Sequence, residues 1–415
     1  MILNVLKNTV LLCLLILLSC GSNSKNESNR VNDTTTNVQN EKPVIVGANQ
    51  TDAYLHLLKG KRIGVVANQS SVIFTFEQDQ DTNLYTHLVD SLLSLKIDIK
   101  RVFSAEHGFR GTTDAGELVK DATDTKTGLP IISLYGKNKK PYAEQLIDLD
   151  VVIFDMQDVG VRFYTYASTL QYMMEACSER GIPLIVLDRP NPNGHYIDGP
   201  TLEIKHRSYL GMHAIPLVHG MTIGEYAKML NGENLLENNL QCNLIIIPNK
   251  NYTHDTFYSL PIRPSPNLPN DLSIKLYPSL GLFEGTNINA GRGTEFQFQR
   301  YGAPFLDKDN MTFTYTPVEN FGAKYPKHKD VLCYGEDLRY QEINDGMTIK
   351  WIIKAYQNAT DKSLFFNTDN FTRHAGTTLL QQQIESGLTE AQIKATWQQD
   401  LNAFKVIRSK YVIYD

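Results

Sequence analysis

The chain has 415 residues, with 40 Lys and Arg residues against 45 Asp and Glu residues and a formal net charge of −5. It has no basic surplus and no long basic run to neutralise a phosphate backbone, so nucleic-acid binding is excluded as a function class. Its hydrophobic content of 42% is ordinary for a globular protein. The roughly 370 residues beyond the polar N-terminal region suffice for one large domain and a smaller one.

The first twenty residues have the order of a secretory signal segment. Lys7 precedes an apolar run, Val10–Leu18, that is about half the roughly 20 residues of a membrane-spanning helix. Leu17–Cys20 resembles a lipobox, which implies cleavage before Cys20 and acylation of its thiol. An ordinary cleaved signal with an incidental cysteine is the alternative.

Residues 21–45 are dominated by Ser, Asn, Thr, Lys and Glu. This composition cannot bury enough apolar surface to fold and predicts a flexible polar tether. With residues 1–20 as a lipoprotein signal peptide, we expect a protein of the cell envelope. Its anchor at Cys20 would hold it on the periplasmic face of a membrane or on the cell surface.

From about residue 46, short apolar runs alternate with helical segments, which is typical of βαβ units around a parallel sheet. Six runs are nearly continuous in Val, Ile and Leu, as strands buried on both faces are. They are Ile63–Ala67, Ile97–Phe103, Pro130–Leu134, Val151–Asp155, Leu184–Asp188 and Leu244–Pro248. The sequence therefore predicts an α/β fold with a doubly wound, mostly parallel sheet over residues 46–250.

Helical patterns separate these runs. Asn83–Leu95 places leucines on one face, and Thr165–Arg180 is closed by Gly181. Thr222–Glu225 matches a capping box that opens a further helix ending near Gly232.

The pattern changes after residue 250. Five prolines lie within Pro261–Pro278 and the glycine-rich stretch Gly281–Gly293 follows, which indicates a domain junction. Helical patterns then occupy Thr348–Gln357, Thr377–Ser386 and Thr389–Lys405, before a predicted strand at Tyr411–Tyr414. We expect residues 251–415 to form a smaller α+β domain.

Ligands of open parallel sheets bind outside the carboxyl ends of the strands, so the polar residues there are the candidate site residues. The strand ends are rich in carboxylates, amides and guanidiniums that would face one crevice. These residues are Glu106, His107 and Arg110 after the second strand, Gln157, Asp158 and Arg162 after the fourth, and Asp188, Arg189 and Asn191 at the end of the fifth.

Several chemistries lack their motifs. No G-x-G-x-x-G follows the first strand and no G-x-x-x-x-G-K-[ST] occurs, so a nucleotide site is not expected. The absence of G-x-S-x-G removes support for a serine nucleophile, and no C-x-x-C, H-E-x-x-H or clustered histidines indicate a metal site. Carboxylate chemistry remains.

Paired carboxylates suit glycoside cleavage, in which a protonated acid donates to the leaving oxygen while a second group stabilises or attacks the sugar. Glu106 is the first candidate for the acid, because it lies on a turn at a strand end where Gly108 and Gly111 give the backbone room. A salt-bridged or helix-capping glutamate is the structural alternative. Glu284, in the glycine-rich stretch, is the second candidate, against an ordinary loop glutamate.

Other side chains could bind an anionic sugar. Arginine forms bidentate hydrogen bonds to carboxylates, and the candidates are Arg110, Arg162, Arg189 and Arg292, with ion pairing as the alternative. Tyr164, Tyr166 and Tyr172 could stack on a sugar ring, although core packing is the favoured interpretation of their helical spacing.

A series of motifs along the chain resembles the NamZ-like exo-β-N-acetylmuramidases from about residue 50 onward. The motifs are Glu106-His-Gly, Thr127-Gly-Leu-Pro, Leu134-Tyr-Gly, Phe154-Asp-Met-Gln-Asp-Val-Gly, Leu187-Asp-Arg-Pro-Asn-Pro, His219-Gly-Met-Thr, Pro264-Ser-Pro-Asn and Glu284-Gly-Thr-Asn. The resemblance implies a Rossmann-like domain, a C-terminal domain and a cleft between them, without a cofactor.

The resemblance also implies an activity. Such an enzyme removes N-acetylmuramic acid from the non-reducing end of peptidoglycan fragments. The glutamate of the family's Glu-His-Gly motif falls on Glu106, which favours Glu106 as a catalytic residue. An anionic lactyl group needs a cation, for which Arg189 and Arg292 are the choices. His219 and Asn287, within the matching motifs, are further substrate-binding candidates.

Three alternatives remain open at this point. The 2-acetamido group permits substrate-assisted catalysis, which leaves the second carboxylate undecided. A lipid-anchored protein that binds wall fragments without cutting them would use the same arginines and tyrosines. A hydrolase of a different acidic sugar would also fit.

Overall fold

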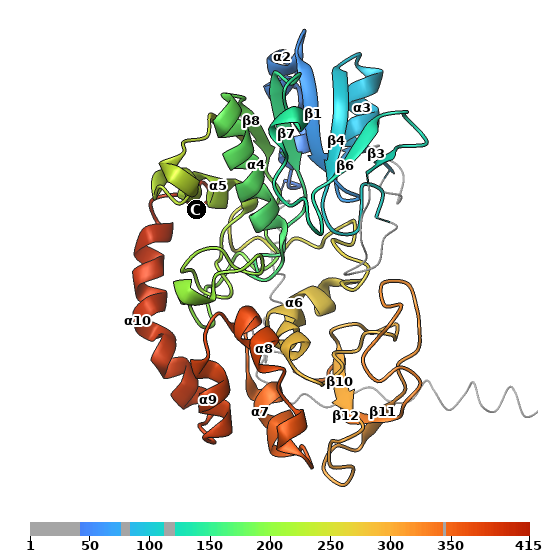
Figure 1. The fold of residues 1–415 in the computed structure, drawn as a ribbon, viewed down its shortest axis with the longest axis vertical. Coiled ribbons are helices and arrows are strands. Elements are labelled where there is room, and N and C mark those ends of the chain that lie inside the picture. The colour runs from blue at the N-terminus through green and yellow to red at the C-terminus, as the bar shows by residue number, and fades with distance from the viewer. Residues whose placement is uncertain (1–41, 76–83, 112–120, 343–345) are drawn as a thin grey trace, which may run out of the picture. The chain divides into compact units, whose positions relative to one another are not determined.

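A computed structural model of the protein describes residues 42–75, 84–111, 121–342 and 346–415. Its central sheet is built from β1 (Arg62–Ala67), β4 (Asp98–Ser104), β5 (Ala122–Thr123), β6 (Pro130–Ser133), β7 (Val151–Asp155), β8 (Leu184–Leu187) and β9 (Leu244–Ile247). The spatial order is β5-β6-β4-β1-β7-β8-β9 (Figure 1). All neighbours pair in parallel except β5, which runs antiparallel to β6.

The six predicted strands all belong to this sheet, which confirms the expected fold class. The chain runs outward from β1 through β4 and β6, returns to β7 on the other side of β1, and continues to β8 and β9. This is a Rossmann-like, doubly wound order with its switch point between β1 and β7. Ligands bind at such a point.

The strands are continuous apolar runs because both faces of the sheet are covered. Along β7, Val152 and Phe154 belong to one buried cluster, whereas Val151 and Ile153 belong to the other. Helices α2 (Thr51–Leu58) and α3 (Leu88–Ser94) pack into the second cluster, and α4 (Tyr166–Arg180) and α5 (Ile223–Gly232) pack into the first.

The ends of α4 and α5 follow the expected signals. Gly181 adopts the left-handed conformation, with φ of 66°, just beyond α4. At the start of α5 the Glu225 backbone amide donates to Thr222 Oγ1 at 3.3 Å, and the Thr222 amide donates to Glu225 Oε2 at 2.9 Å. The capping box is therefore present.

The predicted helix Asn83–Leu95 is wrong in its first half. Leu84–His87 is a strand, β3, that pairs antiparallel with β2 (Val72–Thr75). Helix α3 begins only at Leu88, because the His87 ring accepts a hydrogen bond from the backbone amide of Val89 at 3.2 Å. Hairpin pairing prevails over the leucine periodicity here, and Asn83 lies outside the described residues.

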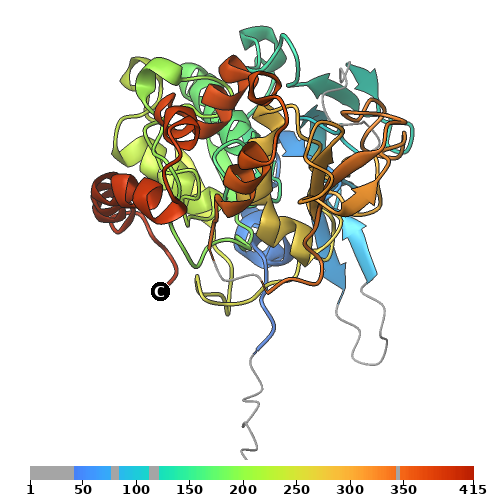
Figure 2. The same cartoon turned by 90° about the horizontal axis from the view of Figure 1, so that it is seen from below.

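The second part of the chain combines helices with a small antiparallel sheet of order β10-β12-β11. Its strands are β10 (Arg300–Ala303), β11 (Phe313–Tyr315) and β12 (Cys333–Asp337). Its helices are α6 (Asp271–Leu280), α7 (Lys350–Gln357), α8 (Thr368–Ala375), α9 (Leu379–Glu385) and α10 (Glu390–Arg408). Figure 2 shows α6 between the green helix α4 and the orange strands. The three helices predicted in this region are confirmed as α7, α9 and α10.

The predicted strand Tyr411–Tyr414 is absent. The backbone amide of Ile413 donates to Glu225 Oε1 at 2.7 Å, so a side chain accepts the hydrogen bond that a neighbouring strand would have accepted. The Tyr414 hydroxyl donates to Asp188 Oδ2 at 2.6 Å. The tail thus returns to the carboxyl end of β8.

The described chain begins beside the sheet. Ile45, at the end of the predicted tether, exchanges backbone hydrogen bonds with Lys250 at 3.0 and 2.8 Å. The predicted signal peptide, Cys20 and most of the tether lie outside the described residues. Over the described ranges, no helix combines the length and apolarity needed to traverse a bilayer.

Candidate active site

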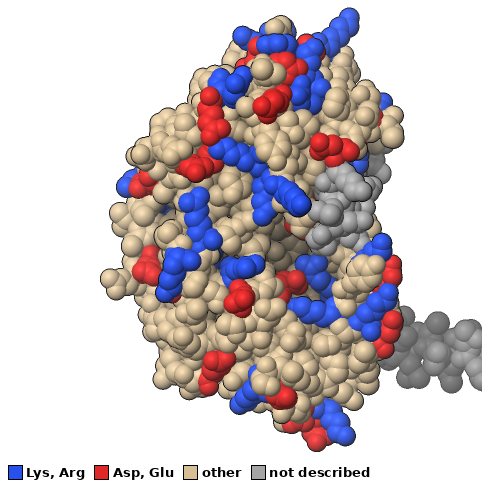
Figure 3. All heavy atoms as spheres, viewed as in Figure 1, with Lys and Arg blue, Asp and Glu red and all other residues tan. Residues whose placement is uncertain are grey.

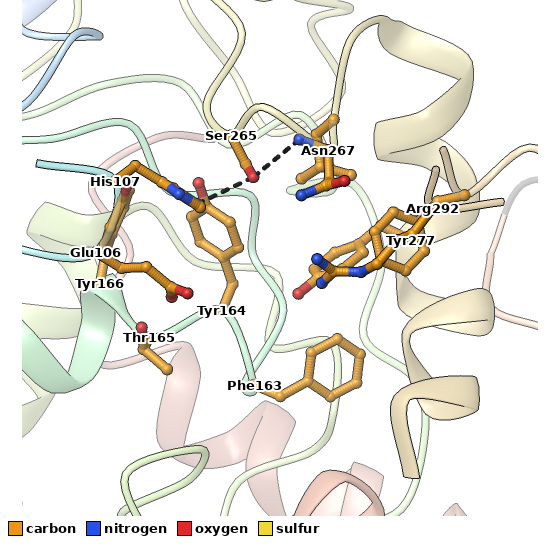
Figure 4. Close-up of a pocket in the computed structure, with 12 residues that line it drawn as sticks. Glu106, His107, Phe163, Tyr164, Thr165, Tyr166, Ser265, Asn267, Tyr277 and Arg292 are labelled. Carbon is orange, nitrogen blue, oxygen red and sulfur yellow. Dashed lines mark hydrogen bonds between the residues drawn. The ribbon is translucent and has the colours of Figure 1, made fainter. Parts of the chain in front are cut away.

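A pocket lies at the carboxyl ends of β4 and β7, beside the switch point, and also takes residues from α6 and the segments around it (Figure 4). Its empty volume, including space open to solvent, is about 420 Å³. The lining residues are Glu106, His107, Phe163, Tyr164, Thr165, Tyr166, Ser265, Asn267, Leu268, Tyr277, Arg292 and Phe298. In Figure 3 the surface is hollowed near the centre of the view.

Glu106 projects its carboxylate into this pocket from the turn after β4 (Figure 4). The turn is tight because His107 and Gly108 adopt left-handed φ values of 71° and 74° in succession. The Tyr135 hydroxyl donates to Glu106 Oε1 at 3.2 Å. His107 is buried, and its Nε2 lies 3.1 Å from Ser265 Oγ, so it links the turn to the proline-rich segment.

Aromatic rings form much of the pocket wall. Tyr164 packs edge-on against Tyr166 with ring centroids 4.8 Å apart, and Tyr277 packs against Phe163 at 5.2 Å and against Phe298 at 4.9 Å. Such surfaces suit the apolar faces of sugar rings, and their hydroxyls suit the polar edges. Tyr172 is elsewhere, stacked on Tyr209.

Sequence reasoning missed Tyr277, Phe298, Ser265 and Asn267 as site residues. Tyr277 and Phe298 carry no local signal, because only the folding of the second part of the chain brings them to the strand ends. Ser265 and Asn267 did have a signal, since they lie in the motif Pro264-Ser-Pro-Asn267.

Arg292 faces Glu106 from the opposite side of the pocket (Figure 4). Its Nε donates to Glu284 Oε1 at 3.0 Å, while its two terminal nitrogens form no hydrogen bond with any residue in the described ranges. Burial lowers the pKa of Arg292, but Glu284, Tyr277 and Glu106 together raise it above its ordinary value. The guanidinium is therefore a stable cation near both candidate carboxylates.

Glu284 lies on a 3-10 turn, η5 (Gly281–Gly285), and does not line the pocket itself. Burial raises its pKa, but Arg292, Lys327 and His374 lower it further, so the net pKa lies below its ordinary value. Glu284 is ionised and reaches the pocket through Arg292.

Three of the four predicted arginines are held by the scaffold. Arg110 bonds Asp90 and Asp124 at 3.0 and 2.7 Å, and Arg189 forms a buried bidentate pair with Asp155 at 2.6 and 2.9 Å. Neither arginine is among the residues that line the pocket, and these carboxylates hold their guanidiniums outside it.

Arg162 also lies outside the lining of the pocket. Its two terminal nitrogens donate to the carbonyls of Pro200, Ile215, His374 and Ala375, which joins the sheet to α8. Burial lowers its pKa to about 9. Its guanidinium therefore fastens the scaffold and does not line the pocket.

The predicted amide residues likewise fix loops. Gln157 Nε2 donates to the carbonyls of Asp158 and Pro190 at 2.8 and 2.7 Å, and Asn191 Nδ2 donates to Met221 O at 2.9 Å. Exposed Asn287 donates to Leu364 O at 2.6 Å. None of the three lines the pocket, so these contacts support positioning of loops and not substrate contact.

Asp158 and His219 are buried behind the pocket with Asp158 Oδ2 and His219 Nε2 3.9 Å apart. Burial raises the pKa of Asp158 to about 7 and lowers that of His219 to about 3, so both are neutral in mildly acidic solution. Asp188 accepts hydrogen bonds from Thr222, Gly224 and Tyr414 at the start of α5, and burial raises its pKa to about 6.

The sequence matches the N-terminal model of the exo-β-N-acetylmuramidase NamZ over residues 63–272 and its C-terminal model over residues 275–414. The chain belongs to the NamZ family. It is 38% identical over 382 residues to the peptidoglycan β-N-acetylmuramidase NamZ of Bacillus subtilis (strain 168), covering 87% of this chain and 89% of that protein. The chain is therefore a glycoside hydrolase.

Two solved structures of DUF1343 family proteins from Bacteroides fragilis NCTC 9343 resemble this NamZ family member. One has a TM-score of 0.79 at 42% identity, and the other 0.74 at 26% identity. Each match covers 90% of this chain and 99% of the solved chain. In the described parts of the chain, no group of three or more His, Cys, Asp or Glu residues could hold a metal ion.

Proposed function

We propose that this protein is an exo-acting β-N-acetylmuramidase that releases N-acetylmuramic acid from the non-reducing end of peptidoglycan-derived glycans. The single observation that carries the proposal is the pocket in which the Glu106 carboxylate faces the Arg292 guanidinium across aromatic walls. The aromatic rings and the few polar side chains that line it are the combination that binding pockets for small ligands present.

Glu106 is the proposed general acid. When the glycosidic bond breaks, the leaving oxygen must take a proton while positive charge develops on the sugar. Glu106 is the only carboxylate among the lining residues, and the Tyr135 hydroxyl orients it by donating to Oε1 at 3.2 Å.

Arg292 is the proposed recognition group for the lactyl carboxylate. Its terminal nitrogens have the fork geometry that binds a carboxylate through two hydrogen bonds, and Glu284 fixes the third nitrogen. Glu284 would thus act by orienting Arg292. The 2-acetamido group of the substrate can supply the second catalytic group.

The test compares the wild type with Glu106→Gln on a chromogenic muramic acid glycoside. We expect activity to fall by at least about 100-fold, since general acid catalysis contributes 10²–10⁴-fold. Glu144→Gln is the matched control, because Glu144 is an exposed residue of the 3-10 turn η2 (Ala143–Gln145). Activity of Glu106→Gln near that of the control would remove Glu106 from the mechanism.

A second assay separates catalysis from binding. A muramic acid-terminated disaccharide is incubated with the wild type, and free N-acetylmuramic acid is measured. Release of the sugar supports the hydrolase, whereas tight binding without release would favour the glycan-binding alternative. Turnover only of other acidic glycosides would overturn the substrate assignment.

We also propose that the protein is exported and anchored through an acylated Cys20 at the cell envelope. Support comes from the order of charge, apolar run and Leu-Leu-Ser-Cys at residues 17–20, followed by the polar stretch 21–45. Cys20→Ala should move the protein from the detergent phase to the aqueous phase on phase separation and remove the lipid mass from the mature N-terminus. An unchanged distribution would contradict the anchor.

A further inference from the structure

An exo-acting enzyme holds the terminal sugar in its pocket, so the rest of the glycan must cross the rim of that pocket. This inference rests on the proposed function and concerns the chain beyond the cleaved bond. The segment 316–332, between β11 and β12, is an orange loop in Figure 1.

The loop is in direct contact with two segments that line the pocket. Asn267, a lining residue, donates through Nδ2 to Gly322 O at 2.7 Å. On the other side, the Val318 amide donates to Gly293 O at 2.9 Å, next to Arg292. Gly293 also packs so closely on Pro326 that a Cβ at residue 293 would lie 2.6 Å from its Cγ.

Lys327 fixes this loop to the turn that bears Glu284. Its Nζ donates to the carbonyls of Phe283 and Thr286 at 2.8 and 2.6 Å, and approaches Glu284 O at 3.2 Å. A lysine that satisfies several carbonyls in a partly buried position holds two segments in one arrangement. The rim is thus a fixed surface that needs no folding when a ligand arrives.

This fixed loop exposes large aromatic side chains. Phe321 is 54% exposed and adjoins Gly322, whereas Tyr325 is 82% exposed and adjoins Pro326. Phe321 thus directly precedes Gly322, which bonds Asn267 of the pocket lining, and Tyr325 directly precedes Pro326, which packs on Gly293 next to Arg292.

We infer that Phe321 and Tyr325 form a platform that binds the sugar rings on the leaving-group side of the cleaved bond. Aromatic faces stack on the apolar faces of pyranose rings, while Tyr325 adds a hydroxyl for the ring substituents. The alternating glycan of peptidoglycan would lie across the loop with its terminal muramic acid at Glu106 and Arg292.

The test uses the double variant Phe321→Ala, Tyr325→Ala and two substrates of different length. For a muramic acid-terminated tetrasaccharide, kcat/KM should fall about tenfold through loss of two ring contacts. For the methyl glycoside of N-acetylmuramic acid, which has no second sugar, the change should stay within about twofold.

Tyr142→Ala is the matched control. Tyr142 is 58% exposed. Lys140, two residues earlier, pairs with Glu179 near the C-terminal end of α4, whereas the pocket residue Tyr166 lies at the N-terminal end of that helix. Equal losses on both substrates would overturn the platform, because they would indicate damage to the pocket itself. Unchanged kinetics on the tetrasaccharide would overturn it as well.

A binding measurement keeps this inference separate from the proposed hydrolysis. In the Glu106→Gln background, the platform variant should weaken tetrasaccharide binding about tenfold and leave the binding of free N-acetylmuramic acid unchanged. An inactive wild type with platform-dependent tetrasaccharide binding would refute the hydrolase and support the platform. Equal tetrasaccharide affinity with and without the aromatic side chains would refute the platform alone.

Discussion

Replacing Arg189 by methionine should destabilise the fold by about 3–5 kcal/mol, which is the cost of leaving a buried charge without its partner. Arg189 bonds both oxygens of Asp155 at 2.6 and 2.9 Å and also donates to Val72 O at 3.0 Å. Both charged side chains are at most 4% exposed, so water cannot replace the lost guanidinium.

The loss should depend on pH. Burial raises the pKa of Asp155 and Arg189 opposes this, so the pKa rises further in Arg189→Met. A carboxyl group whose folded pKa exceeds its unfolded value destabilises the fold above the unfolded pKa, near 3.9. The deficit of the variant should therefore grow as the pH is raised from about 4 toward 8.

Urea unfolding followed by circular dichroism at several pH values measures the deficit. The double variant Asp155→Asn, Arg189→Met should recover part of the lost stability, because it removes the unpaired charge. A deficit below about 1 kcal/mol at neutral pH would refute the buried-pair argument. A large fall in activity per folded molecule would return Arg189 to the substrate site.

Three further results are expected. Arg292→Met should lower kcat/KM on a muramic acid glycoside by about 100-fold through loss of a bidentate carboxylate contact. Arg110→Met should change only the stability toward urea, and similar kinetics for the two variants would contradict Arg292 as the recognition group. Tyr135→Phe should lower kcat about tenfold with little change in KM, because the Tyr135 hydroxyl bonds the proposed acid and not the substrate. Steady-state kinetics measure both constants, and a change confined to KM would contradict this role of Tyr135. Tyr414→Phe should lower the free energy of unfolding by about 1.5–3 kcal/mol above pH 7, where Asp188 is ionised, and by less near pH 4.5. Burial raises the pKa of Asp188 to about 6, so at the lower pH only a neutral hydrogen bond is lost. Equal losses in unfolding experiments at both pH values would contradict this.

The sheet could be predicted because a strand buried on both faces has no polar positions to confuse its pattern. Val151–Asp155 is such a strand, and its bounds match the prediction. Leu84–His87 could not be placed, since its leucines fit a helix and its pairing with Val72–Thr75 is a contact between separate segments. Tyr411–Tyr414 failed for a related reason, because the side chain of Glu225 accepts its backbone hydrogen bonds.

The candidate site was likewise predictable only in part. The strand pattern of β4 predicted that Glu106 lies at the strand ends. The sequence does not show which partner each nearby charged side chain meets. Arg189 and Arg292 look alike as residues, yet one meets a buried Asp155 and the other an open pocket. Neither arrangement is local in sequence, because Asp155 lies 34 positions from Arg189 and Glu106 lies farther still from Arg292.

The return of the C-terminal tail to the sheet has a consequence for how the protein matures. Asp188 and its partner Tyr414 are 226 positions apart, so the polar network at the end of β8 stays incomplete until a distant segment of the chain reaches it. Because a contact of such high sequence separation requires a long loop to close, we expect this hydrogen bond to form late in folding.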